Sequence, residues 1–397
     1  MDHLKQAVTS ITEEVINLRR DFHAYPELGF EEYRTAEKIE TYLRELGLET
    51  KRMAKTGVVG LIEGKSPRPV LMLRADMDAL PVDEANDNLP YCSTYPGVMH
   101  ACGHDAHMAM LLGAAKLLNN MRDDLEGSIK LAFQPNEEVA GALSMIEEGV
   151  LDDPPVDAVM GLHVWTPLES GKLGISPGAI MGGLEIFTIT VQGKGGHTGY
   201  PETAVDPMIA AADIIQSAQR IQTREISLLK PTAIMFGRIT GGTKANIIPD
   251  TVTLEGSVRT LYPDYEQENP MERLKQLAEK VCAVHGCSCI VDWYRENIPL
   301  VNDPALARLA SNVACEISGS EALVSDLACM PGEDFSEFSA RVPGVFIFLG
   351  SGNKGKSCDY PHHNPRFNID EDTLPLGVEM LVRFTLKFFQ DKGVSNQ

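Results

Sequence analysis

The order in which helical and extended apolar patterns follow one another constrains the fold of this chain more than any other feature. Up to about residue 163, segments with apolar residues at steps of three and four alternate with short apolar runs. This alternation is typical of an α/β sheet covered on both faces, which binds ligands at its strand ends. We expect helices at 4–25, 32–46, 108–122 and 142–148, and strands at 57–62, 70–74, 129–134 and 156–163.

A different pattern occupies residues 180–293. It runs strand, helix, strand, strand, helix, strand, which is the order of the ferredoxin-like split β-α-β unit. The α/β pattern then returns as a helix, a strand and a helix at 304–317, 345–349 and 374–389. We therefore expect an α/β fold in which one discontinuous domain, residues 1–179 and 294–397, is interrupted by a smaller inserted α+β domain.

Charge and cysteine content exclude several classes of partner. The chain has 35 lysines and arginines against 56 aspartates and glutamates, which gives a net charge of −21. Such a surface repels phosphate backbones and anionic lipids, so we expect neither nucleic acid nor membrane partners. No apolar run is long enough to span a bilayer, and the N-terminus lacks a signal-peptide core. Eight cysteines in so long a chain are no disulfide framework, which favours a reducing, cytoplasmic location.

Three histidines, a cysteine and an aspartate crowd into His100–His107, between a strand-like segment and a helical pattern. Thiolate and imidazole are the usual ligands of zinc and its first-row neighbours, so Cys102 and His104 are candidate ligands. Asp105 can cap the helix that starts there. A chance cluster in a solvated loop would explain the segment equally well, because structural zinc sites normally contain a second cysteine pair.

Four further polar sites follow the expected strands of the α/β part. They are Asp76 with Asp78, Glu137 with Glu138, His163, and His362 with His363. Each has an ordinary explanation, because neighbouring glutamates suit a helix start and a histidine at a strand end is usually a satisfied core residue. All of them, however, stand where an open α/β sheet places its ligand crevice. Two metal ions would use this many ligands and leave one carboxylate over as a base.

Five motifs together resemble a known family. They are His100-Ala101-Cys102-Gly103-His104-Asp105, Gln134-Pro135-Asn136-Glu137-Glu138, Gly161-Leu162-His163, Gly193-Lys194-Gly195-Gly196-His197 and His363-Asn364-Pro365-Arg366-Phe367. Over nearly the whole chain they resemble the amidohydrolase branch of the dimetal aminoacylase/carboxypeptidase superfamily. That branch includes hippurate hydrolase, indole-3-acetyl-amino-acid hydrolase, N-acetyl-diaminopimelate deacetylase and bacterial aminoacylase. The resemblance implies a mixed-sheet, dimetal exopeptidase-like catalytic domain with an inserted ferredoxin-like lid and dimerisation domain.

The resemblance also implies roles in the α/β part. Two divalent metal ions would be held by Cys102, His104, Glu138, His163 and His363. Glu137 would be the general base on a water that both ions share. His363 is preferred to His362 because the ligand of the family stands four residues before the phenylalanine, here Phe367. Orientation of ligands from behind is expected of Asp76, Asp78 and Asp105, while His107 is expected to pack in the core. Cysteine favours zinc or cobalt, but relatives also use manganese or nickel.

Three residues of the inserted domain match family positions that contact substrate. His197, in a glycine-rich loop, would donate to the oxyanion from a partner subunit. Asn246 and Arg259 would hold the substrate, since an arginine can clamp a free carboxylate. Without the family, the three would be read as exposed residues of a turn, a loop and a strand. Many relatives have Pro-His where this chain has Pro201-Glu202, which leaves the role of Glu202 open.

The expected function is metal-dependent hydrolysis of the amide bond of N-acyl-L-amino acids. A dipeptidase or carboxypeptidase on the same scaffold is the alternative, and a catalytically silent metal-binding protein is a third reading. The presence of Glu137 beside five candidate ligands argues against a silent protein, which would not need a base. The expected partners are a small N-acyl amino acid or peptide and further copies of the chain, in a homodimer or homotetramer formed through the inserted domain.

Overall fold

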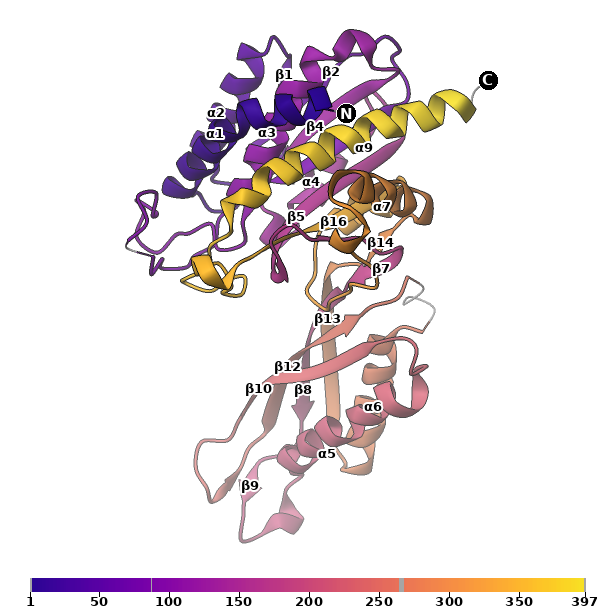
Figure 1. The fold of residues 1–397 in the computed structure, drawn as a ribbon. Helices are drawn as coiled ribbons and strands as arrows, with labels where there is room; N and C mark the ends of the chain where they lie inside the picture. The colour runs from indigo at the N-terminus through magenta and orange to yellow at the C-terminus, as the bar shows by residue number, and fades with distance from the viewer. Residues whose placement is uncertain (1, 87, 264–267, 396–397) are drawn as a thin grey trace. The chain divides into compact units, whose positions relative to one another are not determined.

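The computed structural model describes residues 2–86, 88–263 and 268–395, which form two compact units (Figure 1). The first unit comprises Met1–Gly178, Val301–Leu327 and Asp334–Gln397. The second comprises Ala179–Leu300 and Ala328–Glu333. Each unit has its own hydrophobic core.

Helices and one large sheet make up the first unit. The helices are α1 (Asp2–Ala24), α2 (Tyr33–Glu45), α3 (His104–Asn120), α4 (Gly141–Glu147), α7 (Pro304–Ser318), α8 (Phe335–Ser339) and α9 (Leu374–Ser395). The strands are β1 (Thr50–Met53), β2 (Gly57–Ile62), β3 (Val70–Asp76), β4 (Ser128–Gln134), β5 (Ala158–Glu169), β6 (Leu173–Gly174), β15 (Leu323–Val324) and β16 (Gly344–Gly352). They form one mixed sheet in the order β1-β2-β4-β3-β5-β16-β6-β15. Two short strands, β7 (Gly178–Met181) and β14 (Leu300–Asn302), pair with each other.

The four central strands of this sheet, β4, β3, β5 and β16, run parallel to one another. Every residue of β3, β4 and β16 is buried, which requires cover on both faces of the sheet. Alternate side chains of β16 serve the two faces: Val345 and Ile347 join the core that also contains α1, α3 and α9, while Phe346 packs on Phe335 of α8. Figure 1 shows α1, α3 and α9 side by side across the sheet. The expected α/β class is therefore confirmed.

Several details of the first unit differ from the sequence-based expectation. The strand β1 was not expected, and the helix that contains the histidines begins at His104 rather than at residue 108. The proposed capping by Asp105 is wrong, because Gly103 is the N-cap residue, with φ 92°, and no side chain caps this helix. Glycine at φ near 90° lets the chain turn sharply from Cys102 into the helix.

The second unit contains a four-stranded antiparallel sheet with two helices on one face. Its elements are β8 (Gly183–Gln192), β9 (Gly196–His197), α5 (Pro207–Arg220), β10 (Thr232–Gly241), β11 (Ile247–Ile248), β12 (Thr251–Thr260), α6 (Pro270–Val284) and β13 (Ser288–Asn297). The sheet order is β10-β12-β8-β13, with every pair antiparallel, as in a ferredoxin-like fold. A separate two-stranded ladder joins β9 and β11.

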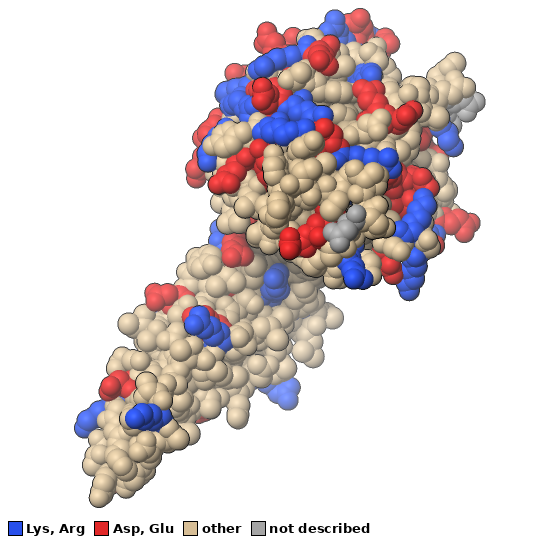
Figure 2. All heavy atoms as spheres, turned by 90° about the vertical axis from the view of Figure 1, so that its left-hand side faces the viewer, with Lys and Arg blue, Asp and Glu red and all other residues tan. Residues whose placement is uncertain are grey.

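The surface of the first unit carries both acidic and basic side chains (Figure 2). On the face that Figure 2 displays, acidic and basic residues are interspersed over this unit, whereas few charged residues stand on the second unit. Among the helices of residues 2–86, 88–263 and 268–395, none combines the length and the apolar character that a membrane crossing requires.

Candidate metal centre

Most of the candidate residues follow the carboxyl ends of the parallel strands. Since β4, β3, β5 and β16 are parallel neighbours, their carboxyl ends meet at one edge of the sheet, and α3 begins there too. Two groups of three ligand atoms form at this edge, with all atoms of a group within 4.8 Å of one another. They are Cys102 with His104 and His163, and Cys102 with Glu138 and His363. The sulfur of Cys102 belongs to both groups.

His104 and His163 both direct Nε2 toward the other candidate ligands. His104 donates through Nδ1 to the backbone oxygen of Asp78 at 2.8 Å, and its buried Nε2 has no hydrogen-bond partner among the described residues. His163 donates through Nδ1 to the backbone oxygen of Val164 at 2.6 Å, and its Nε2 lies 3.5 Å from Sγ of Cys102. In both rings the proton on Nδ1 leaves a lone pair on Nε2.

The adjacent histidines 362 and 363 have different surroundings. His363 adopts a left-handed backbone with φ 64°, its N–H donates to the oxygen of Ala101, and its Nε2 lies 3.2 Å from Oε1 of Glu138. The ring of His362 instead lies 4.7 Å from the ring of Trp165, centroid to centroid, and its Nε2 donates to the oxygen of Val164 at 3.0 Å. The structure thus brings His363, and not His362, to Glu138.

Asp78 holds the turn that carries the paired glutamates. Its carboxylate accepts the backbone N–H of Glu137 at 2.9 Å and that of Glu138 at 3.1 Å. Asn136 precedes them with φ 54°, so the chain turns sharply at the end of β4, and both carboxylates lie with His104 in one group of ligand atoms within 4.8 Å of one another. Glu138 joins His363 and Cys102, while Oε2 of Glu137 lies 3.9 Å from Nε2 of His104.

The other two aspartates bind partners outside the five candidate ligands. Asp76 accepts from His107 at 2.5 Å and from Arg74 at 2.6 Å, and lies 4.0 Å from Nδ1 of His104. Asp105 accepts from Arg19 and from His23 of α1, both at 2.8 Å. Its hydrogen bonds therefore secure α1 rather than a ligand imidazole.

Asp334 and Gln134 support the glutamate turn. The carboxylate of Asp334 accepts from Arg74 at 3.0 Å, from the amide of Gln134 at 2.8 Å and from the backbone N–H of Ala142 at 2.8 Å. Its own N–H points at Oε1 of Glu137 at 3.5 Å. The family resemblance suggests an orienting role for Glu333 and Asp334, like that of Asp105, but it does not predict these contacts, which join residues 192 to 260 positions apart.

The protonation preferences of the cluster depend on burial and on close neighbours. Burial raises the pKa of the Cys102 thiol and holds the pKa of His163 well below its usual range. Burial also acts to lower the pKa of His104, but the charge of Asp76 and the hydrogen bond to Asp78 outweigh it, so this pKa is raised. Hydrogen bonds to Cys102 and then to Glu138 raise the pKa of His363 to about 10.

The donor set fits divalent first-row metal ions. A sulfur, a carboxylate and three imidazoles converge within the two groups, and such soft and intermediate donors suit zinc, cobalt, nickel or manganese. The buried Nε2 of His104, which has no hydrogen-bond partner among the described residues, is the atom that a metal ion would satisfy.

The candidate residues of the second unit form one pair and one separate position. His197 and Ile247 are partners in the β9–β11 ladder, and the oxygen of Asn246 accepts from the N–H of Thr198 at 3.3 Å. Nδ1 of the exposed His197 accepts from the N–H of Gly199 at 2.9 Å, which leaves the ring proton on Nε2. Arg259 stands on β12, where its Nη1 donates to the oxygen of Met330 at 2.9 Å.

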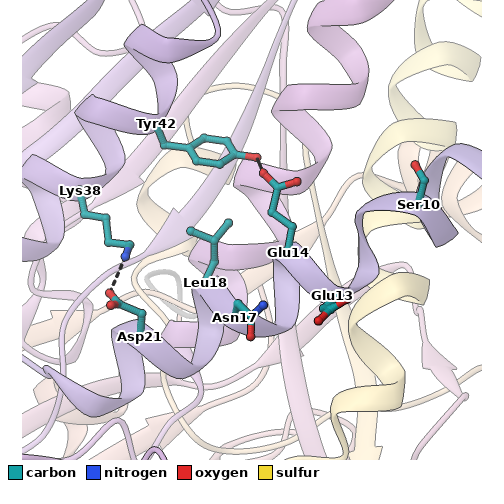
Figure 3. A pocket seen from close by; sticks show the side chains of 8 residues that line it. All are labelled: Ser10, Glu13, Glu14, Asn17, Leu18, Asp21, Lys38 and Tyr42. Carbon is teal, nitrogen blue, oxygen red and sulfur yellow. Dashed lines mark hydrogen bonds and ion pairs between the residues drawn. The ribbon is translucent and has the colours of Figure 1, made fainter.

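A groove of about 670 Å³ between α1 and α2 is a less suitable candidate (Figure 3). Its charged side chains pair with each other: Lys38 lies 2.7 Å from Asp21, and the hydroxyl of Tyr42 donates to Glu14 at 2.8 Å. Among the described residues, the groove gathers no group of histidine, cysteine and carboxylate ligands such as the one at the strand ends, so we place the candidate site there.

Comparison with known proteins agrees with this geometry. The family model described as peptidase family M20/M25/M40 matches residues 72–387. The chain is 38% identical to thermostable carboxypeptidase 1 of Saccharolobus solfataricus over 98% of both chains. It is 38% identical to the N-acetylcysteine deacetylase of Bacillus subtilis, over 91% of this chain and 93% of that protein.

A solved structure of the same family has a similar fold. A Bacillus subtilis protein described as a dinuclear metal binding peptidase of the M20 family superposes with a TM-score of 0.84 and 32% identity. The match covers 96% of this chain and 99% of that structure.

Proposed function

Because the chain belongs to peptidase family M20/M25/M40, we propose that it is a metal-dependent amidohydrolase that cleaves N-acyl-L-amino acids. The observation that carries this proposal is the pair of ligand groups that share Cys102 beside Glu137. A relative with deacetylase activity in its name supports the substrate class. The carboxypeptidase among the relatives keeps cleavage of a dipeptide or of a C-terminal residue as the alternative.

In this proposal Cys102, His104 and His163 hold one divalent ion. Cys102, Glu138 and His363 hold the other. When bound, the two ions supply Lewis acidity that polarises the scissile carbonyl and makes water a better nucleophile near neutral pH. The donor set suits manganese, zinc, cobalt and nickel, and metal content by mass spectrometry distinguishes among them.

Glu137 is proposed as the general base. It takes the proton of the attacking water and delivers it to the leaving amine, so one carboxylate serves both halves of the reaction. Two contacts position it: the carboxylate of Asp78 accepts its backbone N–H, and the N–H of Asp334 points at Oε1. The side chain is therefore held near His104 without being a member of either Cys102 group.

His197, Asn246 and Arg259 are proposed as substrate contacts, in keeping with the family resemblance. The proton on Nε2 of His197 suits donation to a developing oxyanion, in its own or in a partner copy. Arg259 is the candidate clamp for the free carboxylate of an N-acyl amino acid.

We further propose a homodimer or homotetramer that forms through the second unit. Strand β10 is an edge of its sheet, and Met235 and Ile239 on it are 63% and 54% exposed. An exposed edge strand with apolar side chains is a template for pairing with a second copy. We also propose a reducing, cytoplasmic location, because eight cysteines in a chain of 397 residues do not form a disulfide framework and a thiolate ligand requires reducing conditions.

Replacement of Glu137 by glutamine tests the division of roles. We expect Glu137→Gln to keep two metal ions per chain and to lose turnover by roughly 10²- to 10⁴-fold, because only proton transfer is removed. Cys102→Ser should lose both ions, since its sulfur belongs to both groups. Metal content by mass spectrometry and hydrolysis of N-acetyl-L-cysteine, N-acetyl-L-methionine, hippurate and a dipeptide give the readouts.

Glu148→Gln, at an exposed position, is the matched control and should behave as the unchanged protein. Equal metal loss in the Glu137 and Cys102 variants would show that the roles are wrongly assigned. Preference for the dipeptide would favour the peptidase alternative, and inactivity with each of the four metals would favour a silent binding protein.

A further inference from the structure

The backbone N–H and oxygen of Val164 are bound by three imidazoles. The N–H donates to Nε2 of His107 at 2.9 Å. The oxygen accepts from Nδ1 of His163 at 2.6 Å and from Nε2 of His362 at 3.0 Å. The three rings come from α3, from β5 and from the loop after β16, so segments far apart in the sequence meet at the backbone of one residue.

This arrangement fixes the tautomers of the rings. A peptide N–H can only donate, so Nε2 of His107 carries no proton and its Nδ1–H is the donor to Asp76 at 2.5 Å. A peptide oxygen can only accept, so Nδ1 of His163 carries the proton and its Nε2 presents a lone pair to Cys102 at 3.5 Å. Both nitrogens of His107 are thus occupied by protein atoms, which excludes this ring as a ligand in this conformation.

The outer two rings are themselves held in place. Asp76, which binds His107, is bound in turn by Arg74 at 2.6 Å. The ring of His362 lies between those of Trp165 and Phe367, at centroid distances of 4.7 and 5.0 Å. The N–H and the oxygen of Val164 are therefore both bound by side chains that have further partners of their own.

We propose that His107 and His362 are positioning residues that orient His163 through the backbone of Val164, a role that rests on the proposed metal centre. The bond from the ring of His163 to the oxygen of Val164, taken alone, leaves the two peptide groups beside Val164 able to tilt. The bond to His107 holds the peptide group between His163 and Val164, and the bond from His362 holds the peptide group after Val164, so together they fix the direction of Nε2 of His163. If these peptide groups tilted, the ring could take the other tautomer and turn an N–H toward Cys102, which would prevent His163 from binding metal.

Two substitutions of His107 separate this role from simple packing. Glutamine places its side-chain oxygen near the position of Nε2 and can still accept from Val164. Asparagine reaches only the position of Nδ1 and can still bind Asp76, but it loses Val164. We therefore expect His107→Asn to lower the affinity for one of two cobalt(II) ions by roughly 10- to 100-fold. His107→Gln should lower the affinity for neither ion by more than about threefold.

The other ring offers a parallel pair. His362→Gln keeps a donor for the oxygen of Val164, while His362→Leu removes it. Only the leucine variant should lower the affinity for the same cobalt ion that His107→Asn affects. His163→Ala, which deletes the ligand itself, identifies that ion. Cobalt(II) titration followed by calorimetry and by d–d absorption measures each affinity, and the thermal midpoint of the metal-free protein reports folding.

The outcomes are distinguishable. Loss of one ion in the asparagine and leucine variants, with unchanged metal-free thermal midpoints, supports the proposal. Equal losses in the glutamine and asparagine variants, or cobalt affinities like those of the unchanged protein in all four, overturn the positioning role. If the unchanged protein binds two cobalt ions but hydrolyses no acyl amino acid, the proposed reaction fails while the positioning result stands. If it binds none, both fall.

Discussion

Cys102, His104 and His363 each hold a proton that a metal ion has to displace. Burial raises the pKa of the Cys102 thiol, Asp76 and Asp78 raise the pKa of His104, and the hydrogen bonds to Cys102 and Glu138 raise the pKa of His363 to about 10. All three groups are therefore protonated at pH 7 in the metal-free protein, and loading releases their protons. The apparent metal affinity should rise with pH, by about tenfold per pH unit for each proton released, until pH approaches 10.

Calorimetric titration of zinc in buffers of different ionisation enthalpy counts these protons. His363→Ala should lower the count at pH 7 by about one and flatten the pH dependence, while a control change at the half-buried His285 of the second unit, which pairs with Asp213, should leave it unaltered. A proton count near zero at pH 7, or an affinity that falls as pH rises, would contradict this prediction.

At the residue scale, short-range patterns identified the candidates but not their contacts. His104, Glu138 and His163 stand in compact motifs beside expected strands, and the structure brings them together. His107 accepts the backbone N–H of Val164, which lies 57 residues further along the chain, so no local pattern could predict this contact. Asp105 shows the same limit, since its partner Arg19 is 86 residues away.

At the scale of elements, one buried ion pair attaches α1 to α3. Arg19 donates to Asp105 at 2.8 Å, both side chains are fully buried, and the same guanidinium reaches Glu371 at 3.1 Å. We expect Arg19→Met to lower the free energy of unfolding by about 3–5 kcal/mol, because it leaves the buried carboxylate of Asp105 without its strongest partner.

Urea unfolding, with hydrogen exchange to locate the loss in α1 and α3, measures this effect. Lys65→Met is the matched control: its pair with Glu126 is exposed at 51% and 57%, so the change should cost less than about 1 kcal/mol. Similar losses in the two variants would mean that burial does not distinguish the two pairs.

The long, strongly periodic elements were predictable, and the short or irregular ones were not. The first helix follows from its apolar residues at steps of three and four, and Val8, Ile11 and Val15 are indeed buried. Strand β1 has only four residues and one buried side chain, so it carries no alternation to detect. The order of the strands within the large sheet depends on pairings such as β16 with β5, across the second unit in sequence, and was not predictable from local patterns.

At the scale of the whole molecule, the edge strand β10 determines the expected assembly. We expect the double variant Met235→Lys, Ile239→Lys to sediment as a smaller species than the unchanged protein, because pairing at this edge would bury two ammonium groups. Val284→Lys, at an 82% exposed position on α6, is the matched control and should keep the size of the unchanged protein. Sedimentation velocity checks this, and a monomeric unchanged protein would refute the proposed oligomer.

Because the second unit is inserted between His163 and His363, the candidate ligands are synthesised at different times. Four of them precede the second unit along the chain, while His363 follows it and depends on β16, which pairs with β5. A ribosome makes proteins from the N-terminus, so it has to add about two hundred further residues after His163 before His363 exists. On the proposed assignment, a nascent chain cannot acquire its full complement of ions. Binding of the second ion is therefore a late event in the life of the polypeptide, and a chain truncated before residue 363 should emerge without that ion.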